Sequence, residues 1–91
     1  MRITSKFPLG RLVATSNAVE ALRSSDIELA LSRHAMGDWG EVEPDDWEAN
    51  EQALRLGGRL LSVYQSVSGA RFWIITERDR SATTVLLPED Y

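Results

Sequence analysis

The chain has 91 residues, of which 43 % are hydrophobic and 26 % charged, and its ten basic and 14 acidic side chains leave a net charge of −4. A chain of this length builds one modest hydrophobic core, so we expect a single domain spanning residues 1–91. The lack of cysteine excludes disulfides, thiolate zinc sites, iron–sulfur clusters and cysteine nucleophiles. The acidic balance disfavours general nucleic-acid binding, because phosphate contacts need a cationic patch.

No apolar run approaches the ~20 residues that span a bilayer. The N-terminal sequence MRITSKFPLGRLVATS also lacks the apolar centre of a signal peptide. We therefore expect a cytoplasmic protein that does not bind membranes.

The beginning of the chain predicts an extended arm, a short strand and a helix. The arm covers residues 1–10 and ends in the turn formers Pro8 and Gly10. The β-branched and apolar run RLVATS predicts an edge strand. The next segment, SNAVEALRS, has helical spacing, with Asn17 as N-cap and Glu20 completing a capping box.

A stronger helix signal comes from the segment SSDIELALSRHAM. Ser25 as N-cap and Glu28 at the third helical position give a second capping box. Gly37 can adopt a left-handed conformation and stop this helix. The apolar stripe of the helix, at the spacing of one buried face, consists of Ile27, Ala30, Leu31 and His34.

A third helix is predicted from the EPDDW segment to about Leu56, before the pair Gly57-Gly58. Pro44 suits its first turn, and the acids nearby favour the positive end of the helix dipole. Because this short helix carries two apolar stripes, we expect it to pack on two sides. The stripes are Trp47, Asn50 and Leu54, and Ala49, Ala53 and Leu56.

The last third of the chain changes to strand composition. The runs RLLSVYQS, ARFWIIT and SATTVLLP are rich in β-branched and aromatic residues and are separated by turn residues, which predicts a three-stranded antiparallel meander. Both faces of the middle strand are apolar, so we expect helices on one face and partial cover on the other. The predicted fold is a two-layer α+β domain, in which the meander and the short N-terminal edge strand pack against about three helices from the first half of the chain.

His34 is the single histidine and therefore the first candidate for chemistry. It could act as a general base or a metal ligand. We favour a packed position at the end of the buried stripe, near the helix C-terminus, where a partly charged imidazole is stabilised. Without cysteine or a second histidine, a metal would need carboxylates for its other ligands. We expect no metal and no cofactor, and because no catalytic constellation is evident, no catalytic residue.

The acidic segment 38–51 holds seven acids and no base. Its spacing does not match a calcium-binding EF-hand loop, and with so many acids a glycosidase-like carboxylate pair has no specificity. A helix start with favourable acids on a solvated face accounts for residues 43–48. Whether the whole segment is a binding face or only that helix start stays open.

Two tryptophans and an asparagine in this region need a structural explanation. We expect Trp47 to be a core plug because Leu54 shares its face, whereas Trp39 suits a core plug and an exposed partner anchor equally. Asn50 lies on the same stripe as Trp47, and its amide must be satisfied. We expect it to bind loop backbone, with the Asp38–Gly40 corner as the candidate.

The turn between the last two strands, ERDRS, has alternating charges typical of a solvated turn, in which Asp79 and Ser81 bond the local backbone. Its arginines also admit a functional interpretation. A basic strip on the sheet, able to meet phosphate or an acidic partner, would consist of Arg59, Arg71, Arg78 and Arg80.

The most distinctive motifs of the chain are RHAMGDWG (33–40), Asn50, GGRLLSVY (57–64) and WIITERDRSATTVLLPEDY (73–91). Through them, residues 7–91 resemble a family of small bacterial proteins that are carried on plasmids, integrative elements and chromosomes and are usually labelled plasmid-related or uncharacterised. The resemblance supplies no catalytic residues. It implies an accessory protein of mobile elements, and proteins of that kind often act by binding a host or defence-system protein.

We therefore expect a non-enzymatic protein that works through protein–protein contact, either as a modulator of host defence of the anti-restriction or anti-CRISPR kind, or by homo-oligomerising through a sheet edge or an exposed apolar sheet face. The alternatives are a nucleic-acid-binding accessory that uses the arginine strip and an enzyme centred on His34. The residues that we expect at an interaction surface or in the structural corner are His34, Asp38, Trp39, Asn50, Trp73, Arg78 and Arg80.

Overall fold

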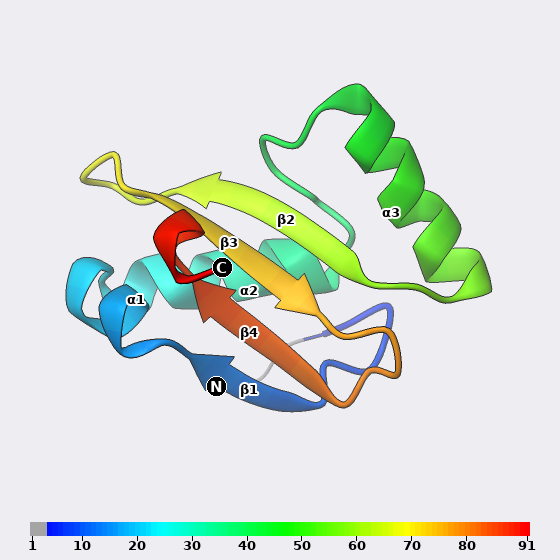
Figure 1. Ribbon diagram of the computed structural model, residues 1–91, viewed down its shortest axis with the longest axis horizontal. Coiled ribbons are helices and arrows are strands. Elements are labelled where there is room, and N and C mark those ends of the chain that lie inside the picture. Colours follow the sequence, from blue (N-terminus) through cyan, green and yellow to red (C-terminus); the bar gives the residue numbers. More distant parts are fainter. Residues whose placement is uncertain (1–3) are drawn as a thin grey trace.

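The computed structural model describes residues 4–91, which form a four-stranded mixed sheet, three α-helices and a short 3-10 helix (Figure 1). The predicted α+β class is confirmed. Of the predicted arm, residues 1–3 lie outside the described residues, and the rest has no regular secondary structure. The elements in chain order are β1 (Arg11–Ala14), α1 (Ser16–Ala21), α2 (Ser24–Ala35), α3 (Pro44–Leu56), β2 (Leu60–Gln65), β3 (Arg71–Thr76), β4 (Ala82–Leu86) and the 3-10 helix η1 (Pro88–Asp90).

The sheet has the strand order β1-β4-β3-β2. Strands β2, β3 and β4 form the predicted antiparallel meander, in which Thr76 of β3 lies opposite Leu60 on one side and Thr83 on the other. Strand β1 is an edge strand, as expected, but it pairs parallel to β4, so the sheet is mixed. The two edges of the sheet are therefore β1 and β2.

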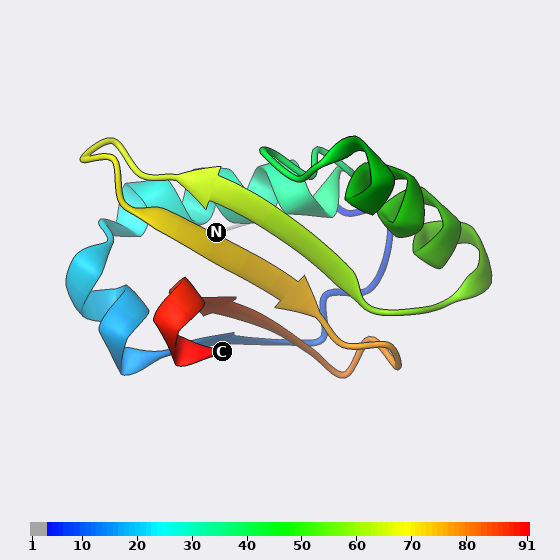
Figure 2. The same cartoon turned by 45° about the horizontal axis from the view of Figure 1, so that its top comes forward.

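Helix α2 lies across one face of the sheet, and η1 lies on the opposite face (Figures 1 and 2). On the η1 face the ring of Tyr91 packs edge-on against Trp73, with centroids 5.5 Å apart. Trp73 is half-buried and Ile75 is buried, so this face is partly covered, as predicted. The main core, on the α2 face, contains Ala18, Leu22, Ala30, Leu31, Tyr64, Phe72, Ile74, Val85 and Leu87.

Helix α3 stands beside the β2 edge (Figure 1) and closes a second, smaller core. That core consists of Phe7, Trp39, Ala53 and Leu60. The prediction that α3 packs on two sides is wrong: Ala49 is exposed and Leu56 is 80 % exposed. Because β2 is the last strand of the sheet, no further element of residues 4–91 covers the outer side of the helix.

The predicted helix ends are correct where backbone geometry sets them. Pro44 begins α3, and Gly37, with φ of +81°, follows the end of α2. The two predicted capping boxes are wrong. The N-cap of α1 is Thr15, whose hydroxyl accepts from the backbone N–H of Ala18, and α2 starts at Ser24 without a side-chain cap.

Thr15 takes the cap because it is already fixed by the sheet, where its own N–H donates to the carbonyl of Val85.

Among residues 4–91, no helix has the length and apolar character needed to cross a bilayer.

Candidate functional site

His34 lies at the centre of a buried polar chain between α2 and the sheet. Its Nδ1 is 2.6 Å from Oγ of Ser62, and its Nε2 is 2.8 Å from Oγ1 of Thr76. Thr76 in turn contacts Thr83 at 2.7 Å, and the Thr83 hydroxyl donates to the carbonyl of Leu9 at 2.7 Å. All five members are thereby joined into one hydrogen-bonded path.

The path fixes the tautomer of the imidazole. Because Thr83 gives its proton to Leu9, it must accept from Thr76, and Thr76 must then accept from Nε2–H of His34. Nδ1 is left as an acceptor for the hydroxyl proton of Ser62. A single neutral tautomer therefore satisfies every group in the chain.

Burial, and secondarily the positive charge of Arg80, lowers the pKa of His34 to about 4. The expected partly charged imidazole is wrong, because the cost of burying the charge outweighs the favourable helix C-terminus. The packed position at the end of the α2 stripe is as predicted, and the side chain is fully buried. His34 is thus held as a neutral core group, out of reach of a substrate.

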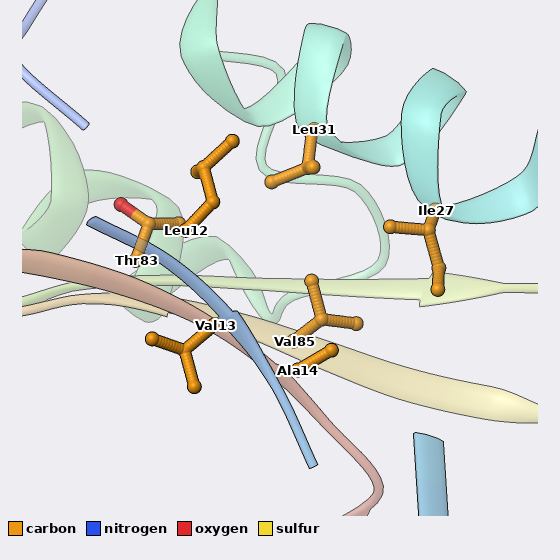
Figure 3. A pocket seen from close by; sticks show the side chains of 7 residues that line it. All are labelled: Leu12, Val13, Ala14, Ile27, Leu31, Thr83 and Val85. Carbon is orange, nitrogen blue, oxygen red and sulfur yellow. The ribbon is translucent and has the colours of Figure 1, made fainter. Parts of the chain in front are cut away.

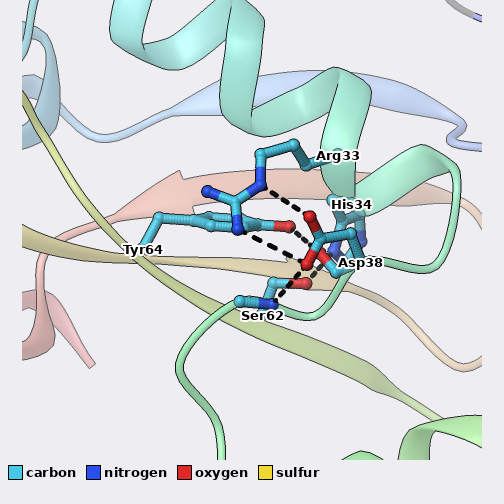
Figure 4. Close-up of polar contacts among 6 residues, drawn as sticks. Arg33, His34, Asp38, Ser62 and Tyr64 are labelled. Carbon is cyan, nitrogen blue, oxygen red and sulfur yellow. Dashed lines mark hydrogen bonds and ion pairs between the residues drawn. The ribbon is translucent and has the colours of Figure 1, made fainter.

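The corner after α2 is fastened by Arg33, Asp38 and Tyr64 (Figure 4). Nε of Arg33 donates to Oδ2 of Asp38 at 2.8 Å, the Arg33 guanidinium lies 4.7 Å from the Tyr64 ring centroid, and the Tyr64 hydroxyl donates to the Asp38 carbonyl. The hydrogen bond from Arg33 lowers the pKa of Asp38. Both charged side chains are partly exposed, so we assign the ion pair to positioning of the corner rather than to large stabilisation.

Trp39 and its neighbours seal the outer edge of β2. The Trp39 ring is fully buried against Phe7 and His34, and its Nε1 donates to Glu51 at 2.8 Å. The Trp39 carbonyl accepts from the N–H of Val63. Of the two roles left open for Trp39, the structure gives it that of a core plug.

Asn50 covers the same edge at Leu61, two residues before Val63 in β2. Its Nδ2 donates to the Leu61 carbonyl at 2.7 Å, and its Oδ1 accepts from the Leu61 N–H at 3.1 Å. The side chain thus replaces a neighbouring strand. The expectation of a loop partner in the Asp38–Gly40 corner is wrong, because the corner bonds β2 through its own backbone.

Trp47 is 38 % exposed, so its predicted role as a core plug is also wrong. The acids of segment 38–51 are similarly directed outward or used locally: Glu51 holds Trp39, and Glu41 pairs with Arg71 at 3.2 Å. Within residues 4–91 no group of three or more metal-ligating side chains comes together.

The four arginines do not form one strip. Arg71 lies at the start of β3, whereas the turn with Arg78 and Arg80 follows its other end. Arg59 packs over the Tyr91 ring, with 5.5 Å to its centroid. Arg80 is turned inward at φ of +62° and donates to the carbonyls of Gly58, Glu77 and Ala53.

At the opposite edge of the sheet, no strand or side chain of residues 4–91 pairs with the outer side of β1. In β1 the N–H groups of Arg11 and Thr15 donate inward to Ser81 and Val85. Because successive backbone groups of a strand alternate in direction, the N–H and C=O groups of Leu12 and Ala14 point away from the sheet. Leu12 is 47 % exposed and Val13 37 %.

An apolar groove of about 120 Å³ runs between this edge and α2 (Figure 3). The Leu12 side chain points toward Leu31 across the groove, whereas Val13 points to the other face of the sheet. Sequence reasoning missed this groove, although consecutive apolar residues in an expected edge strand are a signal for it. The groove is lined by Leu12, Val13, Ala14, Ile27, Leu31, Thr83 and Val85.

The fold and these surfaces define a small α+β domain with a sealed β2 edge and an open β1 edge. No family model, curated protein or solved structure matches the chain.

Proposed function

We propose that the protein is a non-catalytic binding module that acts through protein–protein contact, with the β1 edge as its binding surface. The observation that supports this proposal is the contrast between the two edges. Asn50 and the Trp39 corner pair the outward groups of Leu61 and Val63 in β2, whereas those of Leu12 and Ala14 in β1 have no partner among residues 4–91 and lie beside an apolar groove.

Edge strands in monomeric proteins are usually protected by charges, prolines, bulges or a covering segment. β1 has the sequence RLVA, with one charge at its first residue. An open edge next to an apolar groove suits strand addition, in which backbone hydrogen bonds give affinity and the groove selects alternate side chains.

We extend the proposal to the setting that the sequence motifs imply. An accessory protein of mobile elements, acting on a host defence system in the anti-restriction or anti-CRISPR manner, would need a binding surface of this kind and no catalytic centre. The buried His34 and the separated arginines favour neither of the alternative functions.

The proposal is tested by capture of partners from a bacterial lysate with wild-type protein and with Ala14→Pro as baits. Proline at position 14 removes an outward N–H without removing a bond to β4. We expect the wild-type bait to enrich a defined protein and Ala14→Pro to lose it by at least about tenfold. Leu56→Lys, on the exposed end of α3, is the control that should retain it. Equal capture by Ala14→Pro would exclude the β1 edge as the binding surface.

A further inference from the structure

We infer that the strand accepted by the β1 edge is β1 of a second copy of this chain, paired antiparallel about a twofold axis into one continuous sheet. This inference rests on the proposed function, because it names the occupant of the same edge in the free protein, which the strand of a captured partner would displace. Three independent features of β1 support it: the backbone pattern, the side-chain sizes and the charges.

The backbone pattern selects one register. The outward groups belong to Leu12 and Ala14. A twofold antiparallel pairing centred on Val13 sets each Leu12 opposite the second copy's Ala14, so both residues of each copy enter hydrogen-bonded pairs. Centring the axis on Leu12 or on Ala14 instead would leave the other residue opposite Gly10 or Ser16, beyond the ends of β1.

The side chains match in size in this register. Leu12 and Ala14 both lie on the α2 face, because they are paired with Thr83 and Val85 of that face. A large side chain therefore meets a small one at each pair. The second copy's Leu12 enters the groove beside Ala14, where the apolar walls are Ile27 and Leu31.

The charges are complementary on the opposite face. The register sets Arg11 across from the second copy's Thr15, whose hydroxyl donates to the Asp90 carboxylate at 2.6 Å. Within residues 4–91 neither Arg11 nor Asp90 has an ion-pair partner. Opposed residues of an antiparallel pair have Cβ atoms about 5 Å apart, so the Arg11 guanidinium reaches the second copy's Asp90. The twofold axis makes this contact twice.

The register can be tested by a single cysteine, because the chain has none of its own. At the axis, Val13 faces the second copy's Val13 in a non-hydrogen-bonded pair, whose Cα atoms are about 4.5 Å apart, within the range of a disulfide. Under oxidised glutathione we expect Val13→Cys to form a covalent dimer at least about tenfold faster than Val19→Cys. Val19, in α1, is 60 % exposed and away from the edge, so it controls for simple accessibility.

The charge contact is tested by sedimentation equilibrium of the wild-type protein and of Arg11→Glu. We expect the wild type to dimerise and Arg11→Glu to raise the dimer Kd by at least about tenfold, because two attractive contacts become repulsive. Arg55→Glu, exposed on α3, is the matched control and should leave the Kd unchanged. Equal Kd values for the wild type and Arg11→Glu would overturn the register.

A wild-type protein that stays monomeric, with Val13→Cys no faster than Val19→Cys, would overturn the inference. If Ala14→Pro still abolished capture of a foreign protein in that case, the proposed function would stand, with an extended segment of that protein as the occupant. If instead the dimer formed but capture was insensitive to Ala14→Pro, self-association would be supported and the foreign-partner role of the edge would be lost.

Discussion

His34 exchanges solvent in the unfolded chain for a fully buried position in the fold. It is fully buried, makes two hydrogen bonds to hydroxyls and has a folded pKa of about 4, against 6.5 for a free histidine. Between these values the unfolded state binds a proton that the folded state does not. The free energy of unfolding must therefore decrease as the pH falls through this range.

We predict that this linkage costs about 3 kcal/mol of stability on acidification from about pH 6.5 to pH 4. Urea unfolding of the wild type and His34→Gln at several pH values measures it. The variant should be less stable at neutral pH but should lose less stability on acidification. The pKa values of Asp38 and Asp90 are lowered in the fold, so protonation of these two carboxylates at low pH also decreases the free energy of unfolding. This contribution is the same in the wild type and the variant. Parallel pH profiles would contradict the assignment.

The corner between α2 and α3, residues 38–40, covers the outer edge of β2. Gly40, at φ of +74°, lies against Val63, and a Cβ there would overlap the Val63 carbonyl oxygen and approach the Tyr64 ring to 2.8 Å. Gly57, at φ of +94°, has no atom within 4 Å of the same added Cβ. Both glycines have a positive φ, which disfavours side chains, and they differ in the space available.

Alanine substitutions at Gly40 and Gly57 separate the cost of the backbone conformation from the cost of steric overlap. We predict that Gly57→Ala lowers the free energy of unfolding by about 1–3 kcal/mol, the cost of a side chain at φ of +94° and ψ of +152°. Gly40→Ala should cost at least about 2 kcal/mol more, because the added methyl also pushes the corner off β2. Chemical denaturation of both variants measures the difference, and equal losses would show that the corner yields without cost.

At the scale of the whole molecule, the two sheet edges should differ in dynamics. The N–H groups of Leu61 and Val63 donate to Asn50 and to the Trp39 carbonyl, whereas those of Leu12 and Ala14 point outward. We predict that in dilute solution the Leu12 and Ala14 amides exchange with solvent at least about 100-fold faster than those of Leu61 and Val63.

Native-state hydrogen exchange followed by NMR measures these rates residue by residue. Raising the protein concentration should slow exchange at Leu12 and Ala14 without changing the β2 rates, because only the β1 edge would become paired. Leu12 exchanging as slowly as Val63 in dilute solution would contradict the open edge itself.

Local signals predicted the elements well. Pro44, the acids after it and the Gly57-Gly58 pair bound α3 correctly, and the alternating β-branched runs gave the β2–β3–β4 meander. Local signals failed where a distant segment competed. Thr15 caps α1 in place of Asn17 because β4 already holds its backbone.

The amino-acid sequence by itself determined the α+β class, the position of His34 as the one polar residue of the α2 stripe, and the strand order of the meander. Each of these depends on periodicity and turn residues within a few positions. Only the tertiary structure decided which tryptophan is buried, what Asn50 binds and which edge stays open. These outcomes depend on β2 and β1 being the outer strands. In the segment RHAMGDWGEVEPDDWEANE, Trp39 and Asn50 therefore cover the edge of the sheet at residues 61–63. Only folding brings these two residues into contact with that edge.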